Sequence, residues 1–142
     1  MKIEIIYWSG TGNTEAMANA LADGAKTAGA DVAVTPVSNA AAESALAADV
    51  LALGCSSMGD EVLEESEMEP FVTSIENSLS GKKVTLFGSY GWGDGAWMRD
   101  WTERLSSKGA IIINGEGFIT QDAPDDEAVT GLKDLGKALA DS

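Results

Sequence analysis

The alternation of apolar runs with helix-like segments is the feature that most restricts how this chain can fold. Runs rich in aliphatic residues predict five strands, at Lys2–Trp8, Asp31–Val37, Val50–Cys55, Lys83–Ser89 and Ala110–Ile119, the last interrupted by two glycines. Strands that alternate with helices form a parallel sheet with helices on both faces. The sequence therefore predicts an α/β fold in three layers, α/β/α, in a single domain over residues 1–142.

Apolar residues at helical spacing mark the segments between the strands. Met17, Leu21 and Ala25 recur every fourth residue, and Gly29 follows them as a C-terminal stop. Pro70 suits the first turn of a second helix. Further helices are expected around Trp97–Leu105, where Trp97 and Trp101 should be core residues, and around Leu132–Leu139, with a shorter candidate at 44–48.

The charge balance restricts the partners. Asp and Glu number 23 against 9 Lys and Arg, which gives a formal net charge of −14. Such a chain would repel the phosphates of DNA or RNA, whereas an acidic surface suits basic partner proteins. No apolar run reaches the roughly 18 residues of a membrane span, and the N-terminus lacks the pattern of a signal peptide. We therefore expect a cytoplasmic protein without a nucleic-acid or membrane partner.

The lack of histidine and the single cysteine restrict the chemistry that this chain can perform. The chain has no His and a single cysteine, Cys55. These counts exclude Ser-His and Cys-His nucleophile pairs, His-ligated metals, a Cys-rich zinc site and an iron–sulfur cluster held by four cysteines of one chain. Cys55 follows an apolar run and is expected to be a packed, inert thiol. We predict no catalytic residue and no metal, so any redox chemistry would need a bound organic cofactor.

The first loop, residues 9–14, predicts a phosphate site. In parallel α/β sheets, ligands bind beyond the carboxyl ends of the strands. Hydroxyl, amide and backbone N–H groups at a helix N-terminus can bind a phosphate dianion without a cation. A triphosphate loop would end in Gly-Lys-Ser/Thr, and a dinucleotide loop would have glycine at Glu15. A monophosphate is therefore expected, with candidate ligands Ser9, Gly10, Thr11, Gly12, Asn13 and Thr14.

The second loop, residues 56–66, and the third loop, residues 90–95, predict the walls of a flat ligand. Aromatic residues among glycines seldom belong to a core, so stacking on a planar ring is the better interpretation. Trp8, at the end of the first strand, could belong to either the core or the rim. The candidates are Ser56, Ser57, Met58, Gly59, Asp60, Glu61, Ser89, Tyr90, Gly91, Trp92 and Gly93.

Three motifs together carry a resemblance. SGTGNTE, MGDEVLEES and GSYGWGDG, near the ends of the first, third and fourth expected strands, closely resemble the short-chain flavodoxins of anaerobic bacteria such as the clostridial type. The resemblance covers the whole chain. It implies a flavodoxin-like fold with a five-stranded parallel sheet in the order 2-1-3-4-5 and one non-covalent FMN.

The resemblance also implies residue roles. Ser9, Thr11, Asn13, Thr14 and Ser56 would bind the FMN phosphate. Met58 and Trp92 would enclose the isoalloxazine ring, and Glu61 would accept a hydrogen bond from N3–H, beside Gly59 and Asp60. Backbone atoms of Ser89, Gly91 and Gly93 would contact the pyrimidine edge and the ribityl chain.

Met58 to Glu61 can form a four-residue turn with Gly59 at positive φ, a conformation that glycine adopts at little cost. The resemblance implies that the Gly59 peptide reorients on reduction of the flavin.

The expected function is low-potential, one-electron transfer between redox enzymes, with FMN cycling between semiquinone and hydroquinone. Acidic residues near the ring should oppose the second reduction, because charge in a poorly solvated site costs free energy. Family-typical partners are ferredoxin-linked oxidoreductases and reductases, met by a monomer through its acidic surface. The acids expected to add negative potential around the ring are Asp60, Glu61, Glu64, Glu65, Glu67, Glu69 and Asp94.

Two other classes of protein share features with this chain. A response-regulator receiver needs acids at the ends of the first and third strands, which here end in Tyr7-Trp8-Ser9 and Gly54-Cys55. An FMN-dependent quinone or azo reductase is the alternative function, although this short chain shows no insertion that would build a substrate pocket.

Overall fold

One parallel sheet runs through the centre of the molecule. The computed structural model describes residues 1–113 and 115–142. Its strands are β1 (Lys2–Trp8), β2 (Asp31–Pro36), β3 (Val50–Cys55), β4 (Lys83–Tyr90), β5 (Ile111–Ile112) and β6 (Phe118–Gln121). The strand order is β2-β1-β3-β4-β5, and β6 also pairs with β4. The pairings between these strands are parallel, which confirms the predicted sheet and its order.

The last expected strand is instead two short strands. β5 pairs with the start of β4, at Lys83 and Val84, and β6 pairs with its end, from Phe87 to Tyr90. The expected range 110–119 also includes Asn114, which lies outside the described residues. Gly115 has φ +76°, and a Cβ at Gly117 would collide with the side chain of Met98. Gly117 therefore lies close against α4, and β6 pairs with β4 nearer the carboxyl edge than β5 does.

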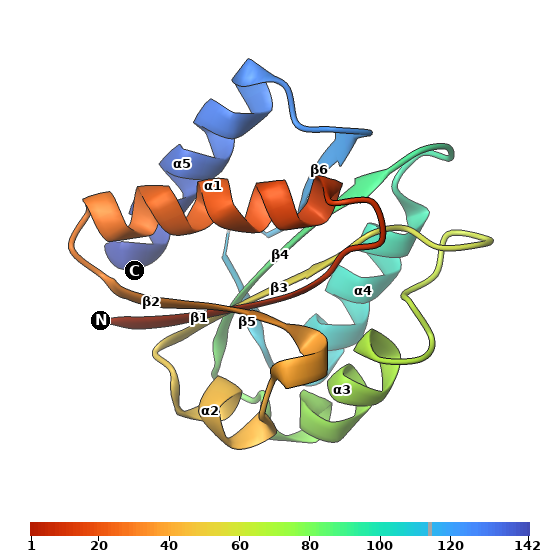
Figure 1. Ribbon diagram of the computed structural model, residues 1–142. Coiled ribbons are helices and arrows are strands. Elements are labelled where there is room, and N and C mark those ends of the chain that lie inside the picture. Colours follow the sequence, from red (N-terminus) through yellow and green to blue (C-terminus); the bar gives the residue numbers. More distant parts are fainter. Residues whose placement is uncertain (114) are drawn as a thin grey trace.

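Helices cover both faces of the sheet (Figure 1). α1 (Asn13–Thr27) and α5 (Asp126–Ala140) cover one face, and α2 (Ala42–Ala47), α3 (Met68–Ile75) and α4 (Ala96–Ser107) cover the other, with short 3₁₀ turns at Val37–Asn39 and Glu76–Ser78. α1 and α5 cross closely, since a Cβ at Gly24 would collide with the Lys133 carbonyl and one at Gly136 with the Leu21 carbonyl. Gly29, at φ +94°, follows α1 as predicted.

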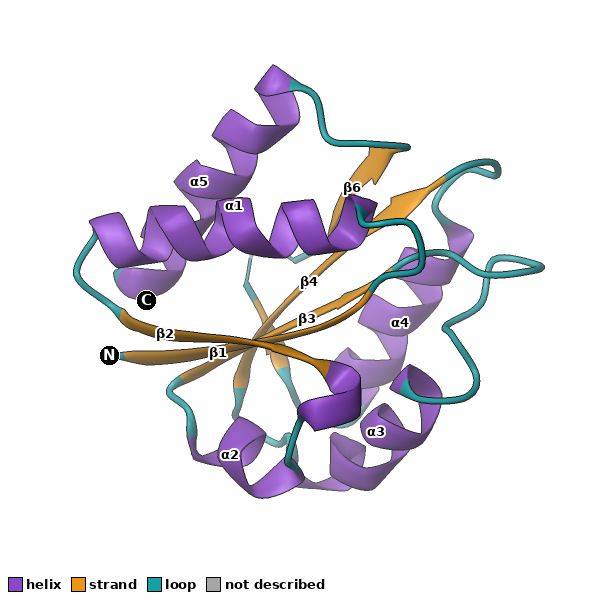
Figure 2. Ribbon diagram, viewed as in Figure 1, coloured by secondary structure: helices purple, strands orange, loops and turns teal. Residues whose placement is uncertain are grey.

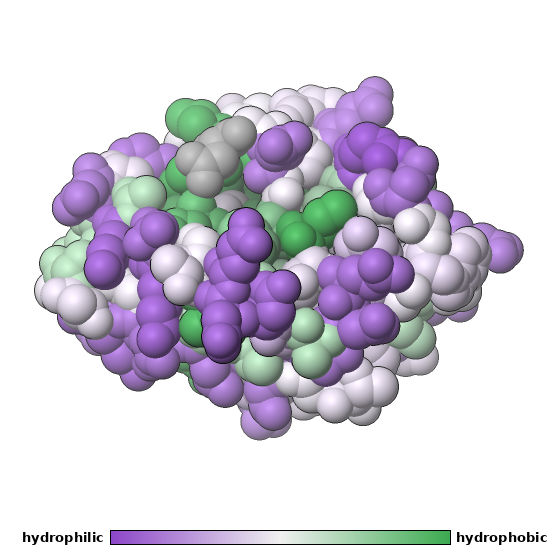
Figure 3. Space-filling model, turned by 90° about the horizontal axis from the view of Figure 1, so that it is seen from above, coloured by the Kyte–Doolittle hydropathy of each residue, from purple (hydrophilic) through white to green (hydrophobic). Residues whose placement is uncertain are grey.

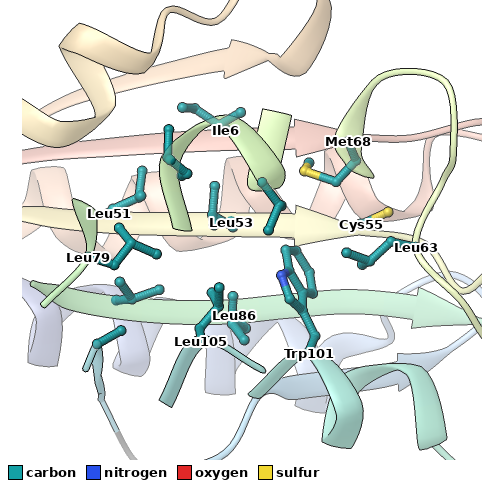
Figure 4. Close-up of a cluster of buried hydrophobic side chains, with 14 of the residues drawn as sticks. Ile6, Leu51, Leu53, Cys55, Leu63, Met68, Leu79, Leu86, Trp101 and Leu105 are labelled. Carbon is teal, nitrogen blue, oxygen red and sulfur yellow. The ribbon is translucent and has the colours of Figure 1, made fainter. Parts of the chain in front are cut away.

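Each face of the sheet has its own hydrophobic core. Successive strand residues point to opposite faces, so Ile5 packs toward α1 and α5, whereas Ile6 packs toward α3 and α4. Figure 4 shows the second core, where Trp101 lies among aliphatic side chains from β3 and β4. Trp97 and Trp101 are each 1% exposed, which confirms them as core residues.

One face of the molecule is largely polar (Figure 3). In Figure 3, hydrophilic side chains surround a smaller hydrophobic area on the face seen from above. Within residues 1–113 and 115–142, none of the helices has the length and apolarity that crossing a membrane requires.

Arg104 on α4 ties this helix to α3 and to the turn that follows it. Its guanidinium donates to both carboxylate oxygens of Glu69, at 2.9 and 2.8 Å, and to both of Glu76, at 3.0 and 2.9 Å. The Arg104 and Glu76 side chains are 27% and 13% exposed, so water screens this pair little. Hydrogen bonds from Arg104 hold the pKa of the Glu69 and Glu76 carboxyls below the ordinary value.

Arg104→Met should lower the free energy of unfolding by about 1–3 kcal/mol at neutral pH, the scale for charge-assisted hydrogen bonds in a shielded site. Because Glu69 and Glu76 have folded pKa values below the ordinary 4.5, their contribution is complete above that pH and is lost as the pH falls through the folded values. Denaturant unfolding on either side of pH 4.5 should therefore show the largest difference from wild type at the higher pH.

Arg99→Met is the matched control, because the side chains of its pair with Asp94 are 62% and 78% exposed. It should change stability little. An Arg104→Met deficit that is equally large well below pH 4.5 would contradict the proposed charge contribution.

Candidate functional site

The loops that follow β1, β3 and β4 meet at the carboxyl edge of the sheet (Figure 2). They border a cavity of about 300 Å³, within the range of small-molecule sites. Predicted residues from all three strand ends line it, namely Gly10, Thr11, Asn13, Ser56, Ser57, Met58, Ser89, Tyr90 and Gly91, together with Trp8 and Asp122. Ser9, Gly12, Thr14, Gly59, Asp60, Glu61, Trp92 and Gly93 lie outside this lining.

The first loop ends in a helix N-terminus that the described side chains leave uncapped. α1 begins at Asn13, and its N-cap Gly12 has φ 93°, a left-handed conformation. The hydroxyl of Ser9 instead accepts a hydrogen bond from the Gly12 N–H at 3.1 Å. The first N–H groups of an α-helix have no acceptor within the helix, and the dipole is positive at this end. The first loop therefore offers donors and positive potential to an anion.

The buried side chain of Thr14 links the loops to one another. It is fully buried, its Oγ1 lies 2.7 Å from Ser56 Oγ, and it accepts from the Ser89 N–H at 3.3 Å. One hydroxyl thus connects the first loop, the start of the second loop and the end of β4. Its role as a phosphate ligand stays a prediction, since these two partners already engage it.

The second loop turns back on itself at Gly59. Met58 and Val62 exchange two backbone hydrogen bonds of 2.9 Å, so the turn closes at Val62 and not, as expected, at Glu61. Gly59 has the predicted positive φ, at 49°. Glu61 also has a positive φ, 58°, which is rare for a residue with a side chain. The turn is therefore one residue longer than the predicted one.

The Glu61 carboxylate is directed at the third loop. Its Oε1 accepts from the backbone N–H groups of Asp94, Gly95 and Ala96, each at 3.1 Å, at the N-terminus of α4. A Cβ at Gly93 would collide with this carboxylate. The second and third loops are therefore joined through one side chain. The predicted contact of Glu61 with a ring N–H is still a prediction.

The third loop carries an exposed aromatic ring and a compensated acid. Trp92 is 63% exposed. The Arg99 guanidinium donates to the Asp94 carbonyl at 2.8 Å and to its carboxylate at 2.9 Å, and this hydrogen bond lowers the pKa of the Asp94 carboxyl. Arg99, which follows the loop in sequence, therefore turns back onto Asp94 and partly compensates its negative charge.

Asp122 is a cavity residue that the sequence analysis missed. It follows β6 with φ 57° and lines the cavity. Its N–H donates to the Tyr90 carbonyl at 2.8 Å, the Ser89 hydroxyl donates to its carbonyl at 2.6 Å, and Gln121 Nε2 donates to the Gly91 carbonyl at 3.3 Å. The Asp-Ala-Pro turn after the last strand was the available signal, because this strand also ends at the carboxyl edge.

A sheet in this order binds its ligand where the order reverses, between β1 and β3. Here that point lies beside an uncapped helix N-terminus and a cavity with aromatic and thioether walls. The fold and the site thus define a class, the α/β proteins that bind a flat mononucleotide.

Comparison with known proteins narrows this class. A family model described as flavodoxin matches residues 5–133. A flavodoxin of Clostridium beijerinckii is 51% identical over 138 residues, which are 97% of this chain and 99% of that protein. The solution structure of two-electron reduced Megasphaera elsdenii flavodoxin superposes with a TM-score of 0.89 at 46% identity, over 99% of each chain.

The chain belongs to the flavodoxin family. Flavodoxins are small electron carriers with FMN as their cofactor, and they are a standard example of ligand binding at a topological switch point. The expected family, fold, cofactor and carrier function are therefore confirmed, and these findings give no support to the quinone or azo reductase.

The residues present fit FMN. The uncapped N–H groups of α1 suit its phosphate, and the described cavity lining contains no Lys or Arg, as predicted for the first loop. Met58 and Tyr90 supply apolar walls beside the hydroxyls of Ser56 and Ser57. This chain therefore supplies suitable groups for both the polar and the flat parts of the cofactor.

Thr14→Val keeps the side-chain shape and removes the hydroxyl. The Ser89 N–H and the Ser56 hydroxyl would lose a buried partner, a loss of about 1–3 kcal/mol. We expect a lower melting temperature without FMN and about tenfold weaker FMN binding in a fluorescence titration.

Thr11→Val is the control, because Thr11 is exposed and lines the cavity. It should weaken FMN binding and leave the melting temperature of the ligand-free protein unchanged. If Thr14→Val behaved in the same way as Thr11→Val, Thr14 would not be the structural link described above.

Proposed function

We propose that the cavity holds FMN with its phosphate at the first loop and its ring between the second and third loops. The observation that carries this assignment is the uncapped N-terminus of α1 with Gly12 in a left-handed conformation. Ser9, Thr11, Asn13 and the backbone N–H groups of this loop would hold the phosphate. Bound FMN supplies reversible electron transfer, and the chain itself binds, orients and shields it.

The ring would lie against Met58 on one side and Trp92 on the other. Met58 lines the cavity, and the exposed Trp92 ring has a large apolar surface that a stacked ligand would cover. The Glu61 carboxylate, held by two N–H groups of the third loop and by that of Ala96 at the start of α4, would keep the two walls at a fixed separation. We infer that these contacts favour a planar ligand.

The potential around the site should oppose the addition of negative charge. No Lys or Arg is among the described residues that line the cavity, and Asp122 adds a carboxylate to its wall. Charge that is poorly solvated and uncompensated costs free energy. We therefore infer a low reduction potential, in spite of the local compensation of Asp94 by Arg99.

The partner is inferred to be a basic surface of a redox enzyme, of the ferredoxin-linked oxidoreductase or reductase kind. Asp60, Glu65 and Glu67 of the second loop are exposed, as are Asp122 and the stretch 125–127 near the other side of the cavity. Attraction between opposite charges speeds such encounters and favours orientations in which the partner meets the edge of the cofactor. We infer a monomeric, single-domain cytoplasmic protein over residues 1–142.

The experiment that tests the cofactor assignment compares FMN with riboflavin in a fluorescence titration. Riboflavin lacks the phosphate, so it should bind at least about 100-fold more weakly, which corresponds to two lost charge-assisted hydrogen bonds. Thr11→Val should weaken the binding of FMN and leave that of riboflavin unchanged. Equal affinities of the wild type for the two ligands would show that the first loop does not bind the phosphate.

The docking surface is tested by the triple variant Asp60→Asn, Glu65→Gln and Glu67→Gln. At low salt we expect about tenfold slower association with a basic redox partner, and a weaker dependence of the rate on salt. Stopped-flow measurement over a range of ionic strength gives both values.

The matched control removes the same charge at the opposite edge of the sheet, with Asp23→Asn, Asp31→Asn and Asp141→Asn, all at exposed positions. It should leave the rate close to that of the wild type. If the two triple variants slow association equally, net charge and not the second loop steers the encounter.

A further inference from the structure

The second loop is closed at its base by a buried contact between Cys55 and Glu64. The Glu64 N–H donates to Cys55 Sγ at 3.5 Å, and the Cys55 thiol donates to the Ser56 carbonyl at 3.3 Å. Cys55 is fully buried at the end of β3, and burial raises the pKa of its thiol to about 12. The thiol is therefore packed, as predicted, and it forms one half of a contact that brings the two ends of residues 56–63 together.

The Glu64 carboxylate fixes the other side of this base. Glu64 is 7% exposed, and its Oε1 accepts from the Ser66 N–H at 2.7 Å. Its Oε2 accepts from the N–H groups of Glu67 and Met68, at 2.8 and 3.0 Å, where α3 begins. Glu67, the N-cap residue, makes no side-chain cap bond in the described structure. Glu64 thus caps α3 from outside the helix.

This arrangement corrects the interpretation of Glu64 as a surface acid. Burial raises the pKa of its carboxyl, but the N–H groups of Met68, Glu67 and Ser66 outweigh this effect and hold the pKa below its ordinary value. A buried charge that accepts several backbone hydrogen bonds anchors the backbone around it. It is poorly placed to steer a partner.

The tip of the loop depends on this base for its position. Gly59 and Asp60 are exposed, Val62 is 44% exposed, and only Leu63, at 7% exposure, joins the core. At its start, the Ser57 N–H donates to the Ser89 carbonyl at 3.0 Å. Little apolar burial therefore fixes the turn between Met58 and Val62. Hydrogen bonds at its two ends define where it lies, together with those that the Glu61 carboxylate accepts from Asp94, Gly95 and Ala96.

We propose that Cys55 and Glu64 form a clasp that positions residues 56–63. The clasp would hold the turn at Gly59 in a fixed position relative to the end of β3, where the turn can contact the cofactor. The two residues are positioning residues, and they act through the backbone of the second loop without touching the ligand. The link from loop position to cofactor binding rests on the proposed function, whereas the clasp itself is a property of the chain.

The first test compares Glu64→Gln with Glu65→Gln. The two substitutions remove the same charge one residue apart, but Glu65 is exposed. In Glu64→Gln, an NH₂ group, which donates and cannot accept, replaces one of the two oxygens that face N–H donors. We expect about tenfold faster hydrogen exchange at the amides of Met58 and Val62, about tenfold weaker FMN binding, and unchanged exchange in α1. Glu65→Gln should match the wild type in all three.

The second test removes the acceptor without changing the charge. Cys55→Ala should accelerate exchange at Val62 in the same way, whereas Cys55→Ser, which keeps an acceptor oxygen, should stay closer to the wild type. The effects of Glu64→Gln and Cys55→Ala on exchange should not add, because each opens the same base. If Glu64→Gln fails to fold, the two Cys55 variants carry the test.

Three results would overturn the clasp: identical behaviour of Glu64→Gln and Glu65→Gln, equal acceleration of exchange in α1 and in the second loop, or unchanged exchange at Val62 in Cys55→Ala. Exchange is measured with and without FMN. A wild type that does not bind FMN would refute the proposed function, and exchange in the ligand-free protein would then decide for or against the clasp by itself.

Discussion

The buried hydroxyl of Thr14 joins three parts of the chain that are far apart in sequence, through Ser56 Oγ at 2.7 Å and the Ser89 N–H at 3.3 Å. The parallel register makes this possible, because β1, β3 and β4 end side by side, with Trp8 opposite Cys55 and Gly54 opposite Phe87. Each loop then begins from a fixed point. The cavity between the loops is thus a consequence of how the strands pair.

Two carboxylates have structural roles that their loop positions in the sequence conceal. Glu61 accepts from three N–H groups at the start of α4, and Glu64 accepts from three at the start of α3. Helix N-termini carry unpaired donors and positive potential, so each acid stabilises a helix that covers the sheet while it fixes the second loop. The second loop is in this way tied to both neighbouring helices.

The acidic residues around the site differ in their surroundings, which the net charge does not show. The net charge of −14 counts 23 Asp and Glu against 9 Lys and Arg, whatever their place in the fold. In the folded chain Asp94 is paired with Arg99, Glu69 with Arg104, and Glu64 is buried, whereas Asp60, Glu65 and Glu67 are exposed. The acids therefore divide into those that hold the framework and those that are available to a partner, and this division depends on contacts between helices and loops.

The sequence by itself determined the alternation of strands and helices and the burial of Trp97 and Trp101, which follow from periodicity over a few neighbouring positions. Its motifs supplied the flavodoxin resemblance, and that resemblance implied the sheet order. The residue types of the first loop predict a phosphate site. The split of the last strand, the closure of the turn at Val62, the place of Asp122 in the cavity and the capping roles of Glu61 and Glu64 were decided only by the tertiary structure. The split strand, the place of Asp122 and the two capping carboxylates depend on partners in other elements, and pairings of that kind leave little local pattern in the sequence. The turn from Met58 to Val62 is local, but it includes a positive φ at Glu61, which is rare for a residue with a side chain.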